Sequence, residues 1–412
     1  MEPTRLNNCI LYVFILKIKL IVLYLKILHL SHDSLPDWRV EKSALTGSRF
    51  GHEVLFAGAK ISKNYERQVF AKTYEINWNA KARYGFPFYW HSVKKQFDKV
   101  IRDVRPDIMH AHNIFSAKMA SEFGIPFVYD DHEYWSKSSL ILNEIEEQDI
   151  ETYTQPKLSL KLLRRSLNRL ARRNINRYLI KLWTKWEKEL ISSCPIITVS
   201  ENIADELRLI DNNLANSVYV VPNFPLCTEV NDIKTPKKYD RLSSVYAGTD
   251  DQNKIKFPQK NIEGFIDLFS TKDIGSLSII GWERKPSAFS KISHTGFLSR
   301  HSMFDEMSKH SIGLIPWKNH WAHVYSSPNK AYEYAHAGLF VMCTISLKPV
   351  SKYLLDNCLT FEDYNQLALQ LSYFKENLDE LYRKRLRIFE FARSNLLWEN
   401  YEKYILRAYQ MC

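Results

Sequence analysis

Short hydrophobic runs alternate with amphipathic segments along the first half of the chain. The runs predict strands at residues 26–30, 52–57, 108–111, 126–129, 195–199 and 218–221, and the amphipathic segments predict helices at 39–50, 90–104, 115–123 and 204–209. Gly51 and Gly124 follow two of these helices, where glycine commonly ends a helix. Alternating strands and helices predict a parallel sheet that is covered by helices.

The same alternation returns after a polar and charged stretch at residues 228–241. Strands are predicted at 244–247, 277–280, 312–315 and 339–342, with helices at 262–269, 304–309 and 331–336. A chain of 412 residues is also longer than one typical domain core. We therefore expect an α/β protein with two tandem Rossmann-like domains, at residues 25–227 and 242–390, joined by the linker 228–241. Because such sheets bind ligands at the carboxyl ends of their strands, we expect the site in a cleft between the domains.

The hydrophobic N-terminus raises the question of a membrane span. Residues 10–30 are long enough to cross a bilayer, but Lys17, Lys19 and Lys26 interrupt them, and a lysine is costly at the bilayer centre. The end of this run is typical of a buried first strand. We expect no membrane span, with residues 1–24 as either a membrane-contacting extension or an over-long gene start.

The charge of +11 favours polyanionic partners, which include nucleic acid, anionic lipid and phosphorylated ligands. Much of it lies in a predicted long helix at residues 156–190. Its basic face carries Lys161, Arg164, Arg165, Arg169, Arg172, Arg173 and Arg177. This face is either the solvated side of a domain helix or, over residues 157–188, a contact with an anionic membrane.

Six cysteines without a close pair favour a reducing compartment and signal no zinc ribbon. We therefore expect a cytoplasmic protein, whose basic helix would allow peripheral contact with the inner face of the cell membrane.

The most informative segment is residues 326–344. Ser327 is predicted as a helix N-cap with Pro328 in the first turn, and Gly338 is predicted to end the helix before an apolar strand. The N-terminus of a helix suits a diphosphate, and Lys330 adds a positive charge there. Glu333, one turn later, could accept hydrogen bonds from two ribose hydroxyls. An ordinary capped helix with surface charges is the alternative.

This segment resembles the donor-binding helix of family 4 glycosyltransferases, which carries Pro-Asn-Lys, then Glu-Tyr, then Ala-Gly before a strand. The resemblance implies that Glu333 binds the nucleotide ribose, and that Asn329 and Lys330 lie near the donor phosphates. Many family members have a second glutamate eight residues earlier, where this chain has Tyr325. The resemblance also places Gly248 and Lys260 at the diphosphate.

In that same loop Thr249 replaces the family's arginine, and Lys254 and Lys256 are further candidates for the diphosphate. The alternative is that these lysines are solvated loop residues.

Further motifs extend the resemblance over nearly the whole chain. They lie at residues 37–54, 105–112, 127–134, 197–201, 220–223 and 396–409. The resemblance implies the GT-B fold, with two Rossmann-like domains facing a cleft and a C-terminal helix, residues 391–412, that crosses back to the first domain. It also implies that Arg39 and His112 lie on the acceptor side of the cleft, and that His132 and Glu133 contact the donor sugar or the acceptor.

The resemblance implies an enzyme that moves a sugar from a nucleotide-sugar donor to a glycan or lipid-linked acceptor with retention of anomeric configuration. Catalysis would then be mainly electrostatic, with Lys330, His132 and Glu133 as the candidate catalytic residues. No Asp-x-Asp motif is present, so we expect no metal and no other cofactor. The alternatives are a nucleotide-sugar 2-epimerase of the same fold and a non-catalytic basic protein that binds membranes. No nucleic-acid partner is expected, because no recognisable nucleic-acid module is present.

Overall fold

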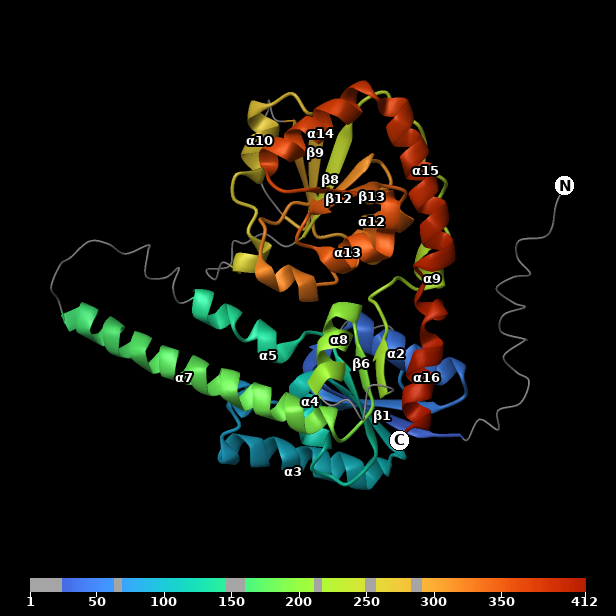
Figure 1. Cartoon of the computed structure of the whole chain (residues 1–412). Helices are drawn as coiled ribbons and strands as arrows, with labels where there is room; N and C mark the ends of the chain where they lie inside the picture. Colours follow the sequence, from blue (N-terminus) through green and yellow to red (C-terminus); the bar gives the residue numbers. More distant parts are fainter. Residues whose placement is uncertain (1–23, 63–68, 146–159, 211–216, 249–256, 283–290) are drawn as a thin grey trace.

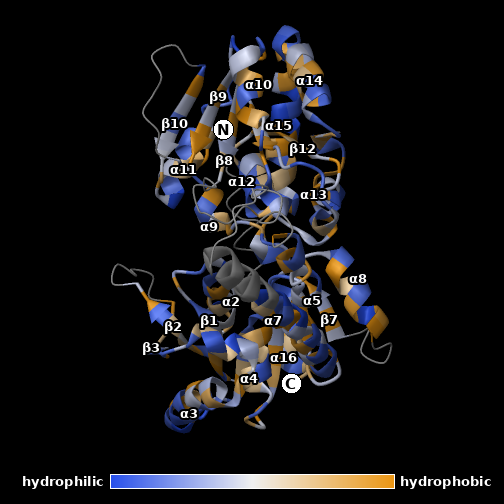
Figure 2. Cartoon of the chain, turned by 90° about the vertical axis from the view of Figure 1, so that its left-hand side faces the viewer, coloured by the Kyte–Doolittle hydropathy of each residue, from blue (hydrophilic) through white to orange (hydrophobic). Residues whose placement is uncertain are grey.

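The structure is a computed structural model of the whole chain. It describes residues 24–62, 69–145, 160–210, 217–248, 257–282 and 291–412. The described residues form two parallel sheets, each covered by helices, which confirms the expected pair of Rossmann-like folds (Figure 1). Figure 2 shows the two sheets in separate domains, with β1 to β3 in one and β8 to β10 in the other.

The first sheet has seven strands in the order β3-β2-β1-β4-β5-β6-β7. Its strands are β1 (Lys26–Leu35), β2 (Glu53–Ile61), β3 (Lys72–Glu75), β4 (Ile108–His112), β5 (Phe127–Asp131), β6 (Ile196–Thr198) and β7 (Val218–Val220). Its helices are α2 (Trp38–Arg49), η1 (Ala80–Tyr84), α3 (Pro87–Val104), α4 (Asn113–Ala120), α5 (Trp135–Ser138), α7 (Leu160–Ile191) and α8 (Glu201–Ile210). The short helix α9 (Cys227–Val230) follows β7 and packs on the second domain. The strand order reverses between β1 and β4, so this is where a ligand site is expected.

The second sheet has six strands in the order β10-β9-β8-β11-β12-β13. Its strands are β8 (Ser243–Ala247), β9 (Ser276–Ile280), β10 (Ile292–Gly296), β11 (Ile312–Ile315), β12 (Phe340–Thr344) and β13 (Cys358–Phe361). Its helices are η3 (Pro258–Lys260), α10 (Phe265–Thr271), α11 (Arg300–Met307), η4 (Trp321–Tyr325), α12 (Asn329–His336), α13 (Lys348–Leu354), η5 (Leu355–Asn357), α14 (Tyr364–Glu376) and α15 (Leu378–Asn395). Here the order reverses between β8 and β11.

The C-terminal segment returns to the first domain. After α15, the chain continues through η6 (Trp398–Asn400) into α16 (Glu402–Gln410), which packs on α2 and the first sheet (Figure 1). Trp398 is fully buried in the core of the first domain, and its indole N–H donates to Thr46 Oγ1 at 2.9 Å. The crossing back that the sequence predicted is therefore confirmed.

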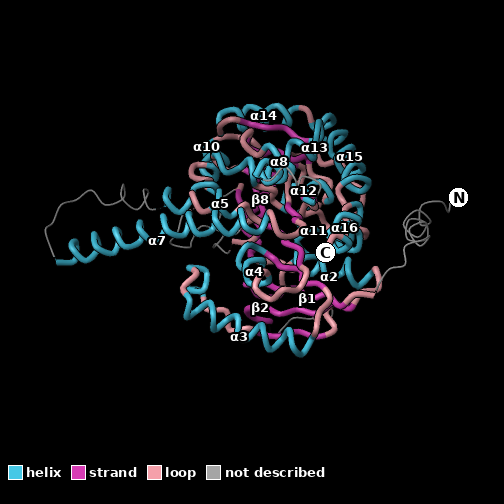
Figure 3. Tube along the Cα trace, turned by 60° about the horizontal axis from the view of Figure 1, so that its bottom comes forward, coloured by secondary structure: helices cyan, strands magenta, loops and turns pink. Residues whose placement is uncertain are grey.

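Helix α7 extends well beyond the body of the first domain (Figures 1 and 3). Its C-terminal half joins the core through Leu179, Trp183, Trp186 and Leu190. Among the described helices, none combines the length and the apolar character that crossing a bilayer requires. The expectation for residues 1–24 falls almost wholly outside the described residues, which begin at Tyr24.

Candidate functional site

Helix α12 begins at Asn329, one residue later than the predicted cap at Ser327 implies. The N-cap is Pro328, and no side chain caps the helix. The prediction of Ser327 as N-cap was wrong, because the Ser327 hydroxyl lies 2.8 Å from the Tyr332 hydroxyl instead. Gly338 follows the helix with a φ of 70°, as predicted for a residue that ends it. No side-chain oxygen therefore caps the N-terminus of α12 in competition with an anion.

Lys330 and Gly248 are brought together at this helix start. Lys330 Nζ lies above the rings of Tyr246, at 4.6 Å from the centroid, and Trp317, at 5.2 Å. A Cβ atom at Gly248 would lie only 3.0 Å from Lys330 Nζ. Burial lowers the pKa of Lys330 to about 8, against the opposing effect of Glu333. The Lys330 amino group therefore lies next to the backbone of Gly248, and the carboxylate of Glu333 offsets its positive charge only weakly.

Glu333 is buried and lies against Arg300, the first residue of α11. Arg300 Nε also donates to Glu229 Oε1 at 3.1 Å, so one guanidinium joins two carboxylates. Burial favours the neutral acid at Glu229, but Arg300 and Lys42 outweigh it and lower the pKa of Glu229. Arg300 also stacks on Trp38 of α2, with 5.0 Å from its central carbon to the ring centroid. This cluster therefore joins the two domains.

The other expected donor residues are less enclosed. Asn329 is exposed at the first position of α12, and Lys260 is exposed at the end of η3. Lys260 Nζ lies 5.9 Å from the centroid of the Phe257 ring. Thr249, Lys254 and Lys256 lie outside the described residues. The structure thus groups Gly248, Lys330 and Glu333 around α12, while Lys260 remains on the neighbouring loop.

On the first domain, Arg39 is buried and holds Asp130. Its Nε and Nη2 donate to Asp130 Oδ1 at 2.9 and 2.6 Å, and its Nη1 donates to the Val221 carbonyl and to Asn223 Oδ1. Burial opposes ionisation of Asp130, but Arg39 and the surrounding imidazoles outweigh it and hold the pKa of Asp130 well below its usual range. The guanidinium that we expected on the acceptor side is thus fully occupied within the domain.

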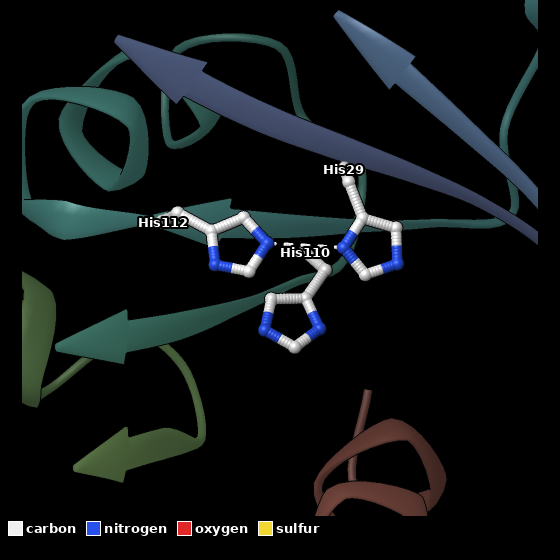
Figure 4. A group of neighbouring side chains, drawn as sticks. All are labelled: His29, His110 and His112. Carbon is white, nitrogen blue, oxygen red and sulfur yellow. Dashed lines mark hydrogen bonds between the residues drawn. The ribbon is translucent and has the colours of Figure 1, made fainter. Parts of the chain in front are cut away.

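A row of histidines lies beside this ion pair. His29 is in register with His110 on the neighbouring strand, and His112 follows on the same face of β4 (Figure 4). His29 Nδ1 lies 3.0 Å from His112 Nε2, and His110 Nδ1 lies 2.8 Å from the Tyr409 hydroxyl. Burial and the neighbouring imidazoles lower the pKa of His29 and His112 well below the usual value. The two rings are therefore neutral at physiological pH.

His132 continues the row toward solvent. Its Nε2 lies 3.0 Å from His112 Nδ1, and 14% of its side chain is exposed. Glu133, the next residue, is exposed. Of the first-domain candidates, His132 and Glu133 are thus accessible to a ligand, whereas Arg39 and His112 are buried.

The sequence analysis did not single out Arg300, Glu229 or Lys42. Arg300 lies 71 positions from Glu229 and 33 from Glu333, so no local pattern connects them. The Ser299 N-cap, whose hydroxyl accepts from the Ser302 backbone N–H, is the one local feature that marks this helix start.

Residues 46–224 match the sequence profile of the family described as Glycosyltransferase Family 4. No curated protein matches the chain. The matched residues lie within the first domain, and they include β2, β4, β5 and the segment that carries His112 and His132.

Solved structures share the fold over almost the whole chain. Sucrose-phosphate synthase from Thermosynechococcus elongatus matches with a TM-score of 0.61 at 13% identity, covering 93% of this chain and 98% of that one. HepE from Anabaena, in complex with UDP-glucose, matches with a TM-score of 0.63 at 11% identity over 94% and 100% of the two chains. A glycosyltransferase from Rickettsia africae matches with a TM-score of 0.59 at 13% identity over 94% and 98%. These TM-scores, over more than nine tenths of each chain, establish the shared two-domain GT-B fold.

Proposed function

We infer that this chain, a glycosyltransferase with the GT-B fold whose residues 46–224 form a family 4 domain, transfers a sugar from a nucleotide-sugar donor to an acceptor. The observation that carries the donor site is the start of α12, where Lys330 stands beside Gly248 and Glu333 is held by Arg300. The solved relative HepE binds UDP-glucose. A uridine nucleotide is therefore the first donor to test.

The proposed chemistry follows from these charges. The diphosphate would lie at the first turn of α12, where backbone N–H groups and Lys330 stabilise the negative charge that develops on it as the glycosidic bond breaks. Gly248 allows Tyr246 and Lys330 to lie against its backbone, since a Cβ atom there would stand 2.7 Å from the Tyr246 hydroxyl and 3.0 Å from Lys330 Nζ. Glu333 would accept hydrogen bonds from the ribose hydroxyls.

We propose that the transfer requires no metal ion, because Lys330 and the N-terminus of α12 already supply positive charge at the proposed diphosphate position. We also propose retention of anomeric configuration, which rests on the resemblance to family 4. His132 and Glu133 would then contact the donor sugar or the acceptor, since both lie at the carboxyl end of β5 and are accessible. Arg39 and His112 would act behind them, by holding Asp130 and the neighbouring imidazole.

We further propose that the acceptor is lipid-linked or lies on a membrane surface. The exposed side of α7 carries Arg172, Arg173 and Arg177. Beside them Tyr178 is 43% exposed and stacks on Phe86, with 6.4 Å between the ring centroids. Basic and aromatic side chains on one surface favour binding to anionic headgroups.

Thermal-shift measurements with UDP, GDP, ADP and their sugars would test the donor site. We expect one nucleotide to stabilise the wild type and to lose this effect in Glu333→Ala, while Glu376→Gln on the exposed end of α14 keeps it. No stabilisation by any nucleotide would favour the non-catalytic protein. Conversion of the donor to its 2-epimer without an acceptor would favour the epimerase.

Sedimentation with liposomes at low salt would test the membrane contact. The wild type should bind vesicles that contain phosphatidylserine more strongly than neutral ones. Glu substitutions at Arg172, Arg173 and Arg177 should abolish this preference. The same change of charge at Lys234, Lys237 and Lys348, which are exposed on the second domain and the linker, should have a much smaller effect. Equal losses in the two triple variants would contradict a specific role of α7. Arg164 and Arg165 belong to the same predicted face, but their side chains lie outside the described part of α7.

A further inference from the structure

Three side chains at the carboxyl ends of β4 and β5 converge on one point. His112 Nδ1 lies 3.0 Å from His132 Nε2 and 3.5 Å from Asp130 Oδ2, and His132 Nε2 lies 3.7 Å from Asp130 Oδ2. Ligand atoms about 2.0–2.2 Å from a tetrahedral zinc ion are separated by roughly 3.3–3.6 Å. Because the three observed separations bracket this range, all three atoms can reach a single ion after small shifts.

We propose that His112, Asp130 and His132 form a binding site for a divalent transition-metal ion of the zinc class. Two imidazoles and one carboxylate are ligands that suit Zn²⁺ and its neighbours Co²⁺ and Ni²⁺. His112 and Asp130 are buried, whereas His132 is partly exposed. The ion would therefore enter, and take a solvent molecule as its fourth ligand, from the side of His132.

The surroundings hold each ligand in the orientation that binding requires. Arg39 donates to Asp130 Oδ1, so Oδ2 is the oxygen that would bind the ion. Asp130 Oδ2 also lies 3.3 Å from His110 Nε2. With His112 Nδ1 bound to the ion, its Nε2–H would donate to His29 Nδ1, 3.0 Å away (Figure 4). Partners of this kind fix the tautomer of a ligating histidine and the rotation of a ligating carboxylate.

A second histidine group is less suited to a metal ion. His29, His110 and His112 also bring ligand atoms within 4.8 Å of one another. All three are fully buried, so an ion would have no open route and no solvent ligand. We therefore assign His29 and His110 to the outer layer of the site. The site is distinct from the proposed diphosphate position at α12, and the metal-free transfer proposed above does not depend on it; His132 is the residue that the two proposals share.

Titration with Co²⁺, followed by visible absorption, tests the site in the full-length chain after removal of any affinity tag. We expect one equivalent of Co²⁺ to produce the ligand-field bands of a tetrahedral ion, and one equivalent of Zn²⁺ to displace it. His132→Gln should lose these bands. His91→Gln, at an exposed position of α3, should keep them. His132→Cys should bind Co²⁺ and add a thiolate-to-metal charge-transfer band, because a thiolate is also a zinc-class ligand.

The proposal is overturned if His132→Gln binds Co²⁺ with the spectrum and stoichiometry of the wild type. It is also overturned if the wild type gives no tetrahedral spectrum, since hydrogen bonds alone would then explain the cluster. Circular dichroism would confirm that the partly exposed position 132 tolerates the change. Nucleotide binding at α12 is measured without metal, so its failure would be distinguishable from failure of this site.

Discussion

The guanidinium of Arg300 forms an ion pair with the carboxylate of Glu333, across the space between the starts of α11 and α12. The same group donates from Nε to Glu229, so Glu333 is oriented before any donor binds. A planar guanidinium can serve two carboxylates through separate N–H groups, whereas a lysine ammonium is a point charge.

Replacing Arg300 should therefore weaken both folding and donor binding. In Arg300→Met, two largely buried carboxylates lose their partner, and we expect a loss of about 3 kcal/mol in the free energy of unfolding. Donor affinity should fall roughly tenfold or more, because the carboxylate of Glu333, which we propose binds the ribose, is no longer held in place. Arg300→Lys should retain only part of the stability and of the donor affinity that Arg300→Met loses. Urea denaturation and donor titration measure the two effects.

The neighbouring exposed residue supplies the control for Arg300. His301→Gln removes an exposed side chain that pairs with the exposed Asp305, and it should leave both the stability and the donor affinity unchanged. Unaltered donor affinity in Arg300→Met would contradict the positioning role of the ion pair.

Tyr325 stands where many family 4 members have a glutamate, and it links the two domains. Its hydroxyl donates to Glu206 on α8, which also pairs with Lys137 at 3.2 Å. Tyr325→Phe should cost about 1 kcal/mol of stability, the usual value of one hydrogen bond. Tyr325→Glu should cost more and lower activity, because it places a second carboxylate beside Glu206.

A double-mutant cycle separates this repulsion from other effects. Adding Glu206→Gln should restore much of what Tyr325→Glu loses, with a coupling energy of about 1 kcal/mol or more. Additive losses would show that the two side chains do not interact.

Donor binding should weaken as the pH rises through the pKa of Lys330. Burial lowers this pKa from its usual value to about 8, so the amino group is mostly charged at pH 7 and mostly neutral at pH 9. One pH unit above the pKa, roughly a tenth of the groups remain protonated, and affinity for the nucleotide diphosphate should fall about tenfold if the charge is required. Calorimetry in buffers of different ionisation enthalpy should detect proton uptake on binding near pH 8.

Substitutions at the same position identify the group that titrates. Lys330→Arg should bind with little dependence on pH over this range, because arginine stays protonated. Lys330→Met should bind weakly at every pH. If Lys330→Arg kept the full pH dependence, Lys42 would be its source, because burial also lowers the pKa of Lys42 to about 8.

Glu187, near the end of α7, should make the fold less stable as the pH rises. Burial raises its pKa from the usual value to about 7, while Lys137 and Glu206 act on it in opposite directions. Between the unfolded pKa near 4.5 and pH 7, the folded chain binds more protons than the unfolded chain, so the free energy of unfolding falls with pH across this window.

Glu187→Gln removes this titration and keeps the size of the side chain. We expect it to stabilise the fold by at most about 3 kcal/mol at pH 8, and by much less at pH 5. Chemical denaturation at the two pH values measures the difference. Glu189→Gln, at an exposed position on the same helix, should show no comparable dependence. An equal effect at both pH values would mean that Glu187 is ionised throughout.

Pattern analysis identified every interior strand of the two sheets and the edge strand β7, and the three strands that it missed all lie at sheet edges. β3, β10 and β13 each lie at the end of a sheet, and most of their residues are at least partly exposed. An edge strand has a neighbour on one side only, so its sequence shows no continuous apolar run.

The candidate donor helix was predictable because its features lie close together in the sequence. A helix start, a lysine and a glutamate one turn apart are local features, and α12 places Lys330 and Glu333 as the sequence implies. The exception is Ser327, whose hydroxyl found a partner in Tyr332 because tertiary packing brought the two together.

The sequence by itself determined the alternation of most strands and helices, the two Rossmann-like domains and the position of the candidate donor helix, because these depend on periodicities and motifs within short windows. Only the tertiary structure decided which partners the charged groups take. Arg39 reaches Asp130 across 91 positions and Val221 across 182, and His29 reaches His112 across 83. Such pairs form because the fold places distant segments side by side, with β1 next to β4 for the histidines and α2 against β5 and the end of β7 for Arg39. No local pattern records which side chains will meet there.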